Sequence, residues 1–132
     1  YQDINDWERH LARSGTVPLK FFLNISKEEQ LKRLLARVDD PDKNWKFSPY
    51  DVAERKLWDE YQKVYEDTIR NTATKHAPWY VVPCDKKWFA RLVVAAALAE
   101  QMEALDLQFP KVSDEDKKAI EAAHAELLTE KK

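Results

Sequence analysis

The sequence predicts a helix-rich α/β fold with parallel strands, because two apolar runs are each followed by a helix start. The run 17–25 (VPLKFFLNI) is almost entirely apolar, which is typical of a strand buried on both faces. Ser26 follows at once, with Glu29 three residues later, and this capping box begins a helix without an intervening loop. The run 79–83 (WYVVP) is followed by Asp85, the expected N-cap of another helix. A direct change from strand to helix indicates an α/β unit.

The remaining elements follow from the helical spacing of apolar residues and from residues that typically start or end a helix. Residues 3–14 carry apolar side chains at helical spacing, and Gly15 is a suitable residue to end that helix. Residues 39–47 (DDPDKNWKF) predict a loop. A start signal at 48–51 (SPYD) predicts one helix that runs to about residue 71. A last helix begins after Ser113 and continues into Lys131 and Lys132.

The helix expected at 86–105 is apolar nearly all round, so it should be deeply buried. Two strands do not make a stable parallel sheet, and this helix needs more cover than the chain provides. The simplest explanation is that partner strands lie outside these residues. The chain does not begin with Met, which agrees with its being a piece of a longer protein.

Composition excludes several classes of function. The net charge is −2, so nothing indicates general nucleic-acid binding, and a basic site has to be local. One cysteine, Cys84, excludes an internal disulfide framework and fits a reducing cytoplasm. The sequence has no apolar run of 18 residues, so no membrane span is expected. With Gly15 as its one glycine, the chain cannot build a glycine-rich phosphate loop.

Five basic residues on the two helices that follow the first strand, and in the loop between these helices, resemble the lid of a nucleotide kinase. Such a lid closes over phosphates, neutralises their charge and expels water. Arginine suits this task because its guanidinium donates two parallel hydrogen bonds to a phosphate. The alternative is a solvated helix face that pairs with nearby aspartates (39, 40, 42 and 51). The basic residues are Arg33 and Arg37, one turn apart, Lys43 and Lys46 in the loop, and Arg55.

A second group of charged residues follows the run 79–83. In open α/β sheets, ligands bind at the carboxyl ends of the strands. Asp85, Lys87 and Arg91 are therefore candidates for substrate binding, although N-capping alone accounts for Asp85. The three histidines, at 10, 76 and 124, have no metal-ligand spacing, so no metal site is assigned within the chain.

The residues up to about 110 resemble the polyphosphate kinase 2 family. The resemblance rests on three long strings of mixed composition: NWKFS (44–48), DVAERKLWDEY (51–61) and APWYVVPCDKKW (77–88). It implies a P-loop kinase-like, three-layer α/β fold, and it divides the chain into residues 1–110, with a lid at about 26–72, and a helical extension at 111–132. Family members transfer phosphate between inorganic polyphosphate and nucleoside mono- or diphosphates, with Mg²⁺.

The resemblance also implies roles for individual residues. Arg37, Lys46 and Arg55 correspond to the catalytic cations of the lid. Substrate binding falls to Arg33, Asn44, Asp85, Lys87 and Arg91. The phosphate-binding loop and the aspartates that bind Mg²⁺ belong to the N-terminal half of the family, outside this chain. The family tends to form dimers or tetramers.

Two functions are compatible with these observations. The first is a cytoplasmic, polyphosphate-dependent nucleotide phosphotransferase (ADP/ATP or GDP/GTP), to which this chain supplies the lid and the C-terminal half. On that hypothesis the 132 residues alone are inactive. The second is a non-catalytic module that binds polyanions or protein and is derived from the same scaffold.

Overall fold

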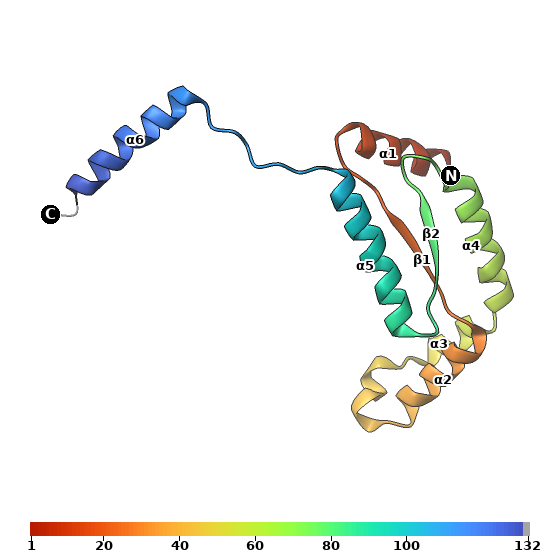
Figure 1. Cartoon of the computed structure of the whole chain (residues 1–132). Coiled ribbons are helices and arrows are strands. Elements are labelled where there is room, and N and C mark those ends of the chain that lie inside the picture. The colour runs from red at the N-terminus through yellow and green to blue at the C-terminus, as the bar shows by residue number, and fades with distance from the viewer. Residues whose placement is uncertain (131–132) are drawn as a thin grey trace. The chain divides into compact units, whose positions relative to one another are not determined.

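The computed structural model describes residues 1–130, and the chain divides into a first unit, 1–97, and a second unit that begins at Leu98. The expected end of the last helix at Lys131 and Lys132 lies outside the described residues. Figure 1 shows the order of the elements. They are α1 (Gln2–Arg13), β1 (Lys20–Asn24), α2 (Lys27–Val38), the 3₁₀ helix η1 (Pro41–Lys46), α3 (Pro49–Arg55), α4 (Trp58–Thr72), β2 (Trp79–Pro83), α5 (Lys87–Ala104) and α6 (Asp114–Thr129).

The two strands pair in parallel, as predicted. Their register runs from Lys20 opposite Trp79 to Asn24 opposite Pro83. The amide of Lys20 donates to the carbonyl of Pro78 at 3.2 Å, and the amide of Cys84 donates to the carbonyl of Asn24 at 2.9 Å. Both strands therefore end at the same edge, from which α2 and α5 begin. β1 is shorter than the run 17–25, because Pro18 has no amide to donate to a strand ladder.

A largely buried ion pair joins α1 to the start of β1 and the end of α4. The Lys20 ammonium donates to Glu8 at 2.6 Å and to the carbonyl of Thr72 at 2.7 Å. The two charged side chains are 15% and 10% exposed. The indole of Trp79 donates to the hydroxyl of Thr72 at 2.9 Å. This network fixes the amino end of the strand pair between the two helices.

Replacing Glu8 with Ala is expected to lower the free energy of unfolding by about 3 kcal/mol, because it leaves the largely buried Lys20 charge without its partner. The control is Asp6→Ala, which breaks the exposed pair with Arg9, whose side chains are 53% (Arg9) and 50% (Asp6) exposed. Such a pair contributes less than about 1 kcal/mol. Urea unfolding followed by circular dichroism measures both changes, and equal losses would contradict a special role for Glu8.

Two predicted elements differ from the structure between α2 and β2. The loop at 39–47 contains η1, which begins at Pro41 after Asp40 caps it by accepting from the amide of Asp42. The single helix expected up to residue 71 is two helices, α3 and α4. Amides of Lys56 and Leu57 bond three residues back, to Ala53 and Glu54, and this tighter turn separates the helices.

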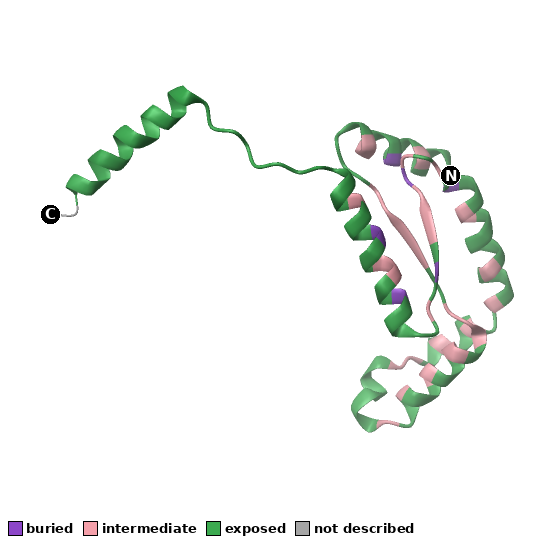
Figure 2. Cartoon of the chain, viewed as in Figure 1, coloured by how far each residue is buried: buried purple, intermediate pink, exposed green. Residues whose placement is uncertain are grey.

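The prediction of a deeply buried α5 is wrong for the described residues. Ala90 and Ala97 are buried, whereas Trp88, Leu92 and Met102 are 63%, 58% and 63% exposed. Figure 2 shows the same pattern, with most of each helix exposed. Val82, on β2, is 1% exposed, but its neighbour Val81 is 54% exposed. The strand pair and α5 thus present apolar surface that the described residues do not cover. No helix in the range 1–130 has the length and hydropathy that a membrane crossing needs.

Candidate functional site

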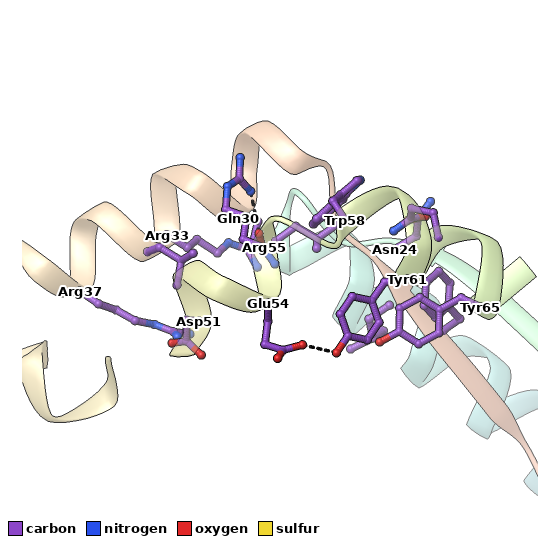
Figure 3. A pocket seen from close by; sticks show the side chains of 15 residues that line it. Asn24, Gln30, Arg33, Arg37, Asp51, Glu54, Arg55, Trp58, Tyr61 and Tyr65 are labelled. Atoms are coloured by element: carbon purple, nitrogen blue, oxygen red, sulfur yellow. Dashed lines mark hydrogen bonds between the residues drawn. The ribbon is translucent and has the colours of Figure 1, made fainter. Parts of the chain in front are cut away.

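A pocket of about 510 Å³ opens at the carboxyl end of β1, between α2, α3 and α4. Figure 3 shows arginine and aromatic side chains in its lining, together with the acidic side chains of Asp51 and Glu54. Arginines from α2 and α3 form one side, namely Arg33, Arg37 and Arg55. Aromatic residues form the other side, namely Phe22, Trp58, Tyr61 and Tyr65. The pocket therefore offers positive charge beside flat apolar surface.

Arg33 is held by hydrogen bonds within the chain. Its Nε donates to the carboxylate of Glu29 at 2.9 Å, and its Nη2 donates to the carbonyls of Cys84 and Asp85, each at 2.9 Å. Burial acts to lower the pKa of Arg33, but the hydrogen bonds with Glu29 and Cys84 outweigh it and the pKa is raised. The guanidinium therefore keeps its charge, and most of its donors already have acceptors.

Arg55 joins α3 to the first turn of α2. Its Nη1 donates to the carbonyl of Lys27 at 2.8 Å and to the side chain of Gln30 at 2.6 Å. Its guanidinium carbon lies 5.9 Å from the centre of the Trp58 ring. The Nε and Nη2 groups have no recorded partner within residues 1–130, so Arg55 keeps donors for a ligand while it ties the two helices together.

Arg37 is the pocket arginine whose guanidinium has no hydrogen bond or ion pair to any described residue. It lies one turn beyond Arg33 on α2, as the i, i+4 spacing predicts. In Figure 3 its side chain extends toward Asp51 on α3. A cation in a pocket without an internal partner is the group best placed to bind an anionic ligand.

The residues of η1 lie near this pocket but do not line it. The side-chain amide of Asn44 donates to the carbonyls of Arg37, Val38 and Asp40 at 2.7, 2.9 and 3.1 Å, so it holds the last turn of α2. Lys46 places its ammonium 4.8 Å from the centre of the Trp45 ring. Lys43 pairs with Asp40, as the alternative of a solvated, paired face predicts for that residue.

A second hollow, of about 600 Å³, lies where β2 passes into α5. Asp85 lines it together with Ser26 of the other strand end and Trp88 of α5. α5 begins at Lys87, so Asp85 lies one residue before the N-cap position, and its carboxylate accepts from the amide of Ser26 at 2.7 Å. Lys87 and Arg91 are exposed on the first turns of α5 and line neither hollow.

Sequence reasoning missed the acidic and aromatic lining of the first pocket. The hydroxyl of Tyr61 donates to the carboxylate of Glu54, and this hydrogen bond raises the pKa of Tyr61. The Tyr65 ring lies 5.9 Å from that of Tyr61 and 4.9 Å from that of Phe22. The i, i+4 spacing of the two tyrosines can be read from the sequence, but it predicts a helix face packed in the core as readily as one that lines a pocket. Residues 1–130 contain no cluster of three acidic, histidine or cysteine side chains that could hold a metal ion.

Comparison with known proteins identifies the family. The family model described as polyphosphate kinase 2 matches residues 1–110. The chain belongs to the polyphosphate kinase 2 family. A crystal structure of polyphosphate kinase 2 from Arthrobacter aurescens TC1 superposes with a TM-score of 0.83 at 45% identity, covering 93% of this chain and 44% of that one. This similarity confirms the P-loop kinase-like α/β fold expected from the resemblance.

Three curated relatives differ in how much of their length the chain spans. The AMP/ADP-polyphosphate phosphotransferase of Meiothermus ruber is 47% identical over 120 residues, which are 91% of this chain and 45% of that protein. The ADP-polyphosphate phosphotransferase of Rhodopseudomonas palustris is 44% identical over 97% of this chain and 44% of its own length. An uncharacterised protein from the chlN 3′ region of Leptolyngbya boryana is 48% identical over the whole chain and 92% of its own length. The chain thus spans just under half of the two relatives named as phosphotransferases and nearly all of the third.

Proposed function

We propose that this chain supplies the lid and the C-terminal half of a polyphosphate-dependent nucleotide phosphotransferase. The enzyme would transfer phosphate between inorganic polyphosphate and a nucleoside mono- or diphosphate, such as ADP or GDP. The observation that carries the proposal is the unpaired Arg37 in a pocket of three arginines at the carboxyl end of β1, within the residues 1–130 that the structure describes. Relatives named as polyphosphate phosphotransferases support it and do not favour a non-catalytic binding module.

In this proposal the cations of the lid act by charge and position. Phosphoryl transfer spreads negative charge over the oxygens of the moving group, and positioned cations stabilise that charge. Arg37 and the free donors of Arg55 would contact these oxygens, and Lys46 on η1 would approach when the lid closes. Closure would also exclude water, which competes as an acceptor. No covalent bond to the protein is needed.

The other candidate residues take supporting roles. Asn44 keeps η1 against the end of α2, so it fixes the approach of Lys46. Lys87 and Arg91 on the first turns of α5 would meet the far end of a long polyanion. The lid is proposed at about 26–72 within a kinase-like region, residues 1–110, with 111–132 as a helical extension. The complete protein is proposed to be a homodimer or tetramer, as the family resemblance implies, and to be cytoplasmic, as its single cysteine suggests.

Magnesium is the expected cofactor of such a reaction, but residues 1–130 do not fit it. They contain no cluster of ligating side chains, and Asp51 and Glu54 are the acids among the arginines of the pocket. Mg²⁺ would therefore have to be held by residues outside this chain, and none of the roles given above depends on it.

Binding of polyphosphate to the complete natural polypeptide that contains these residues tests the proposal. Isothermal titration with inorganic polyphosphate is expected to show saturable binding that weakens as salt rises, because exposed charges are screened. Replacing Arg37 with Gln should weaken it about 10- to 100-fold, as the loss of a charge-assisted hydrogen bond predicts. The absence of saturable binding to the unsubstituted protein would overturn the proposed function.

A further inference from the structure

The beginning of α2 is fastened to the turn between β2 and α5 by side chains from both segments. Asp85 accepts from the amide of Ser26 at 2.7 Å. Arg33 reaches in the opposite direction, and its Nη2 donates to the carbonyls of Cys84 and Asp85, each at 2.9 Å. We call Ser26, Arg33 and Asp85 the α2 clamp. Its members lie up to 59 residues apart in the sequence.

The Asp85 carboxylate and the Nε and Nη2 groups of Arg33 are bonded to internal partners, which leaves Nη1 of Arg33 without a partner among residues 1–130. Arg33 also donates from Nε to Glu29, and its side chain is 24% exposed. A phosphate that bound Arg33 in place of these acceptors would leave two carbonyls and a carboxylate without their donor. The Asp85 carboxylate holds the backbone of Ser26, and this hydrogen bond lowers the pKa of Asp85, so it accepts in its charged form. Most of the hydrogen-bonding capacity of Arg33, and the Asp85 carboxylate, thus serve contacts within the protein.

The clamp instead determines where Arg37 lies. Arg37 is one helical turn beyond Arg33, so its position follows that of the α2 axis, and α2 contacts the strand ends at the clamp. The end of α2 is held separately by Asn44. We infer that Arg33 and Asp85 are positioning residues, which hold α2 so that Arg37 faces the phosphates, and that neither contacts the substrate. This inference rests on the proposed function for the identity of the ligand.

Two substitutions of Asp85 separate a hydrogen-bond acceptor from a charged ligand group. Asn keeps an oxygen that can accept from the Ser26 amide, whereas Ala removes it. In the complete natural polypeptide, we expect Asp85→Ala to weaken polyphosphate binding about three- to tenfold, as the loss of one hydrogen bond predicts, and Asp85→Asn to stay within about twofold of the unsubstituted protein. If Asn is as damaging as Ala, the charge of Asp85 acts directly and the inference is overturned.

A double-mutant cycle tests Arg33 in the same protein. Arg33→Gln is expected to weaken polyphosphate binding about tenfold when Arg37 is present and less than about twofold in the Arg37→Gln background, since Arg33 acts through Arg37. A direct contact between Arg33 and phosphate predicts the same loss in both backgrounds. Equal losses would therefore overturn the inference.

A readout without polyphosphate keeps the clamp testable if the proposed function fails. Amide hydrogen exchange at Ser26 should become faster in Asp85→Ala and remain slow in Asp85→Asn. In the same two variants, the NMR signal of the Arg37 Nε–H group should shift with Ala and not with Asn. An unshifted Arg37 signal in Asp85→Ala would overturn the positioning role, whether or not the protein binds polyphosphate.

Discussion

Replacing Arg37 with Gln in the complete natural polypeptide is expected to lower polyphosphate-dependent phosphate transfer by about 10²- to 10³-fold, the loss typical of one preorganised charge-stabilising donor. Arg37 lines the pocket at the end of β1 and has no internal partner within residues 1–130. In the proposed reaction, its charge would stabilise the oxygens of the transferred group. The substitution preserves most of the side-chain length, so the fold should be retained.

The control for this prediction is Arg70→Gln. Arg70 is exposed on α4 and pairs with Glu66, with side chains 74% and 63% exposed. Removing that pair should leave kcat/KM within about twofold, because exposed ion pairs contribute little even to stability. Measurement of kcat/KM for ADP and polyphosphate in both variants decides the matter. If kcat/KM in Arg37→Gln exceeds about one-third of the unsubstituted value, Arg37 does not have the proposed catalytic role. Loss of one preorganised donor would lower the rate by a much larger factor.

The free edge of β1 is expected to bind a further strand that residues 1–130 do not supply. In a parallel pair, alternate residues of each strand direct their backbone groups to the partner. The recorded bonds of Lys20 and Asn24 to β2 therefore leave the backbone groups of Phe21 and Leu23 on the opposite edge. Leu23 is also 51% exposed, which is unusual for a leucine within a parallel sheet.

The outer edge of β2 is less suited to this role. By the same alternation, Trp79, Val81 and Pro83 direct their backbone groups outward, and Pro83 has no amide to donate. Proline in a sheet is found mainly on edge strands. β1 is therefore the strand expected to become internal, and an added parallel strand would end beside the arginine pocket.

Amide hydrogen exchange measures this prediction residue by residue. In the 132-residue chain alone, the amides of Phe21 and Leu23 should exchange much faster than that of Phe22, which the register directs toward β2. In the complete natural polypeptide all three should be protected. Fast exchange at Phe21 and Leu23 in the complete polypeptide would show that no strand is added at this edge.

Local signals in the sequence predicted local structure well. Ser26 caps α2 by accepting from the amide of Glu29, and Ser113 caps α6 by accepting from that of Asp116. The parallel strands followed from apolar runs joined to helix starts. The break after α3 was not predicted, since the pattern of 48–71 is helical throughout and the turn at residues 56–57 has no glycine or proline to mark it.

The arginines that line the pocket were among the predicted site residues, but their hydrogen-bond partners were not predicted. The i, i+4 spacing predicted that Arg33 and Arg37 lie on the same face of one helix, and both line the pocket. Spacing could not show that Arg33 is bonded to the carbonyls of Cys84 and Asp85, more than fifty residues away. Nor could spacing show that the Asp85 carboxylate accepts a hydrogen bond from the Ser26 amide instead of capping α5. The expected burial of α5 was wrong for the described residues. An apolar helix sequence predicts that the helix packs against other elements, but the described residues contain no further strands that could cover α5.

Transfer of labelled phosphate tests the central claim most directly. The complete natural polypeptide would be mixed with ³²P-labelled polyphosphate, ADP and Mg²⁺, and the products would be separated, with the 132-residue chain assayed in parallel. We predict label in the γ-phosphate of ATP for the complete polypeptide and none for the chain alone, which has one glycine and so cannot form a glycine-rich phosphate loop. Unlabelled ATP, or label released only as inorganic phosphate, would contradict polyphosphate-dependent transfer to the nucleotide.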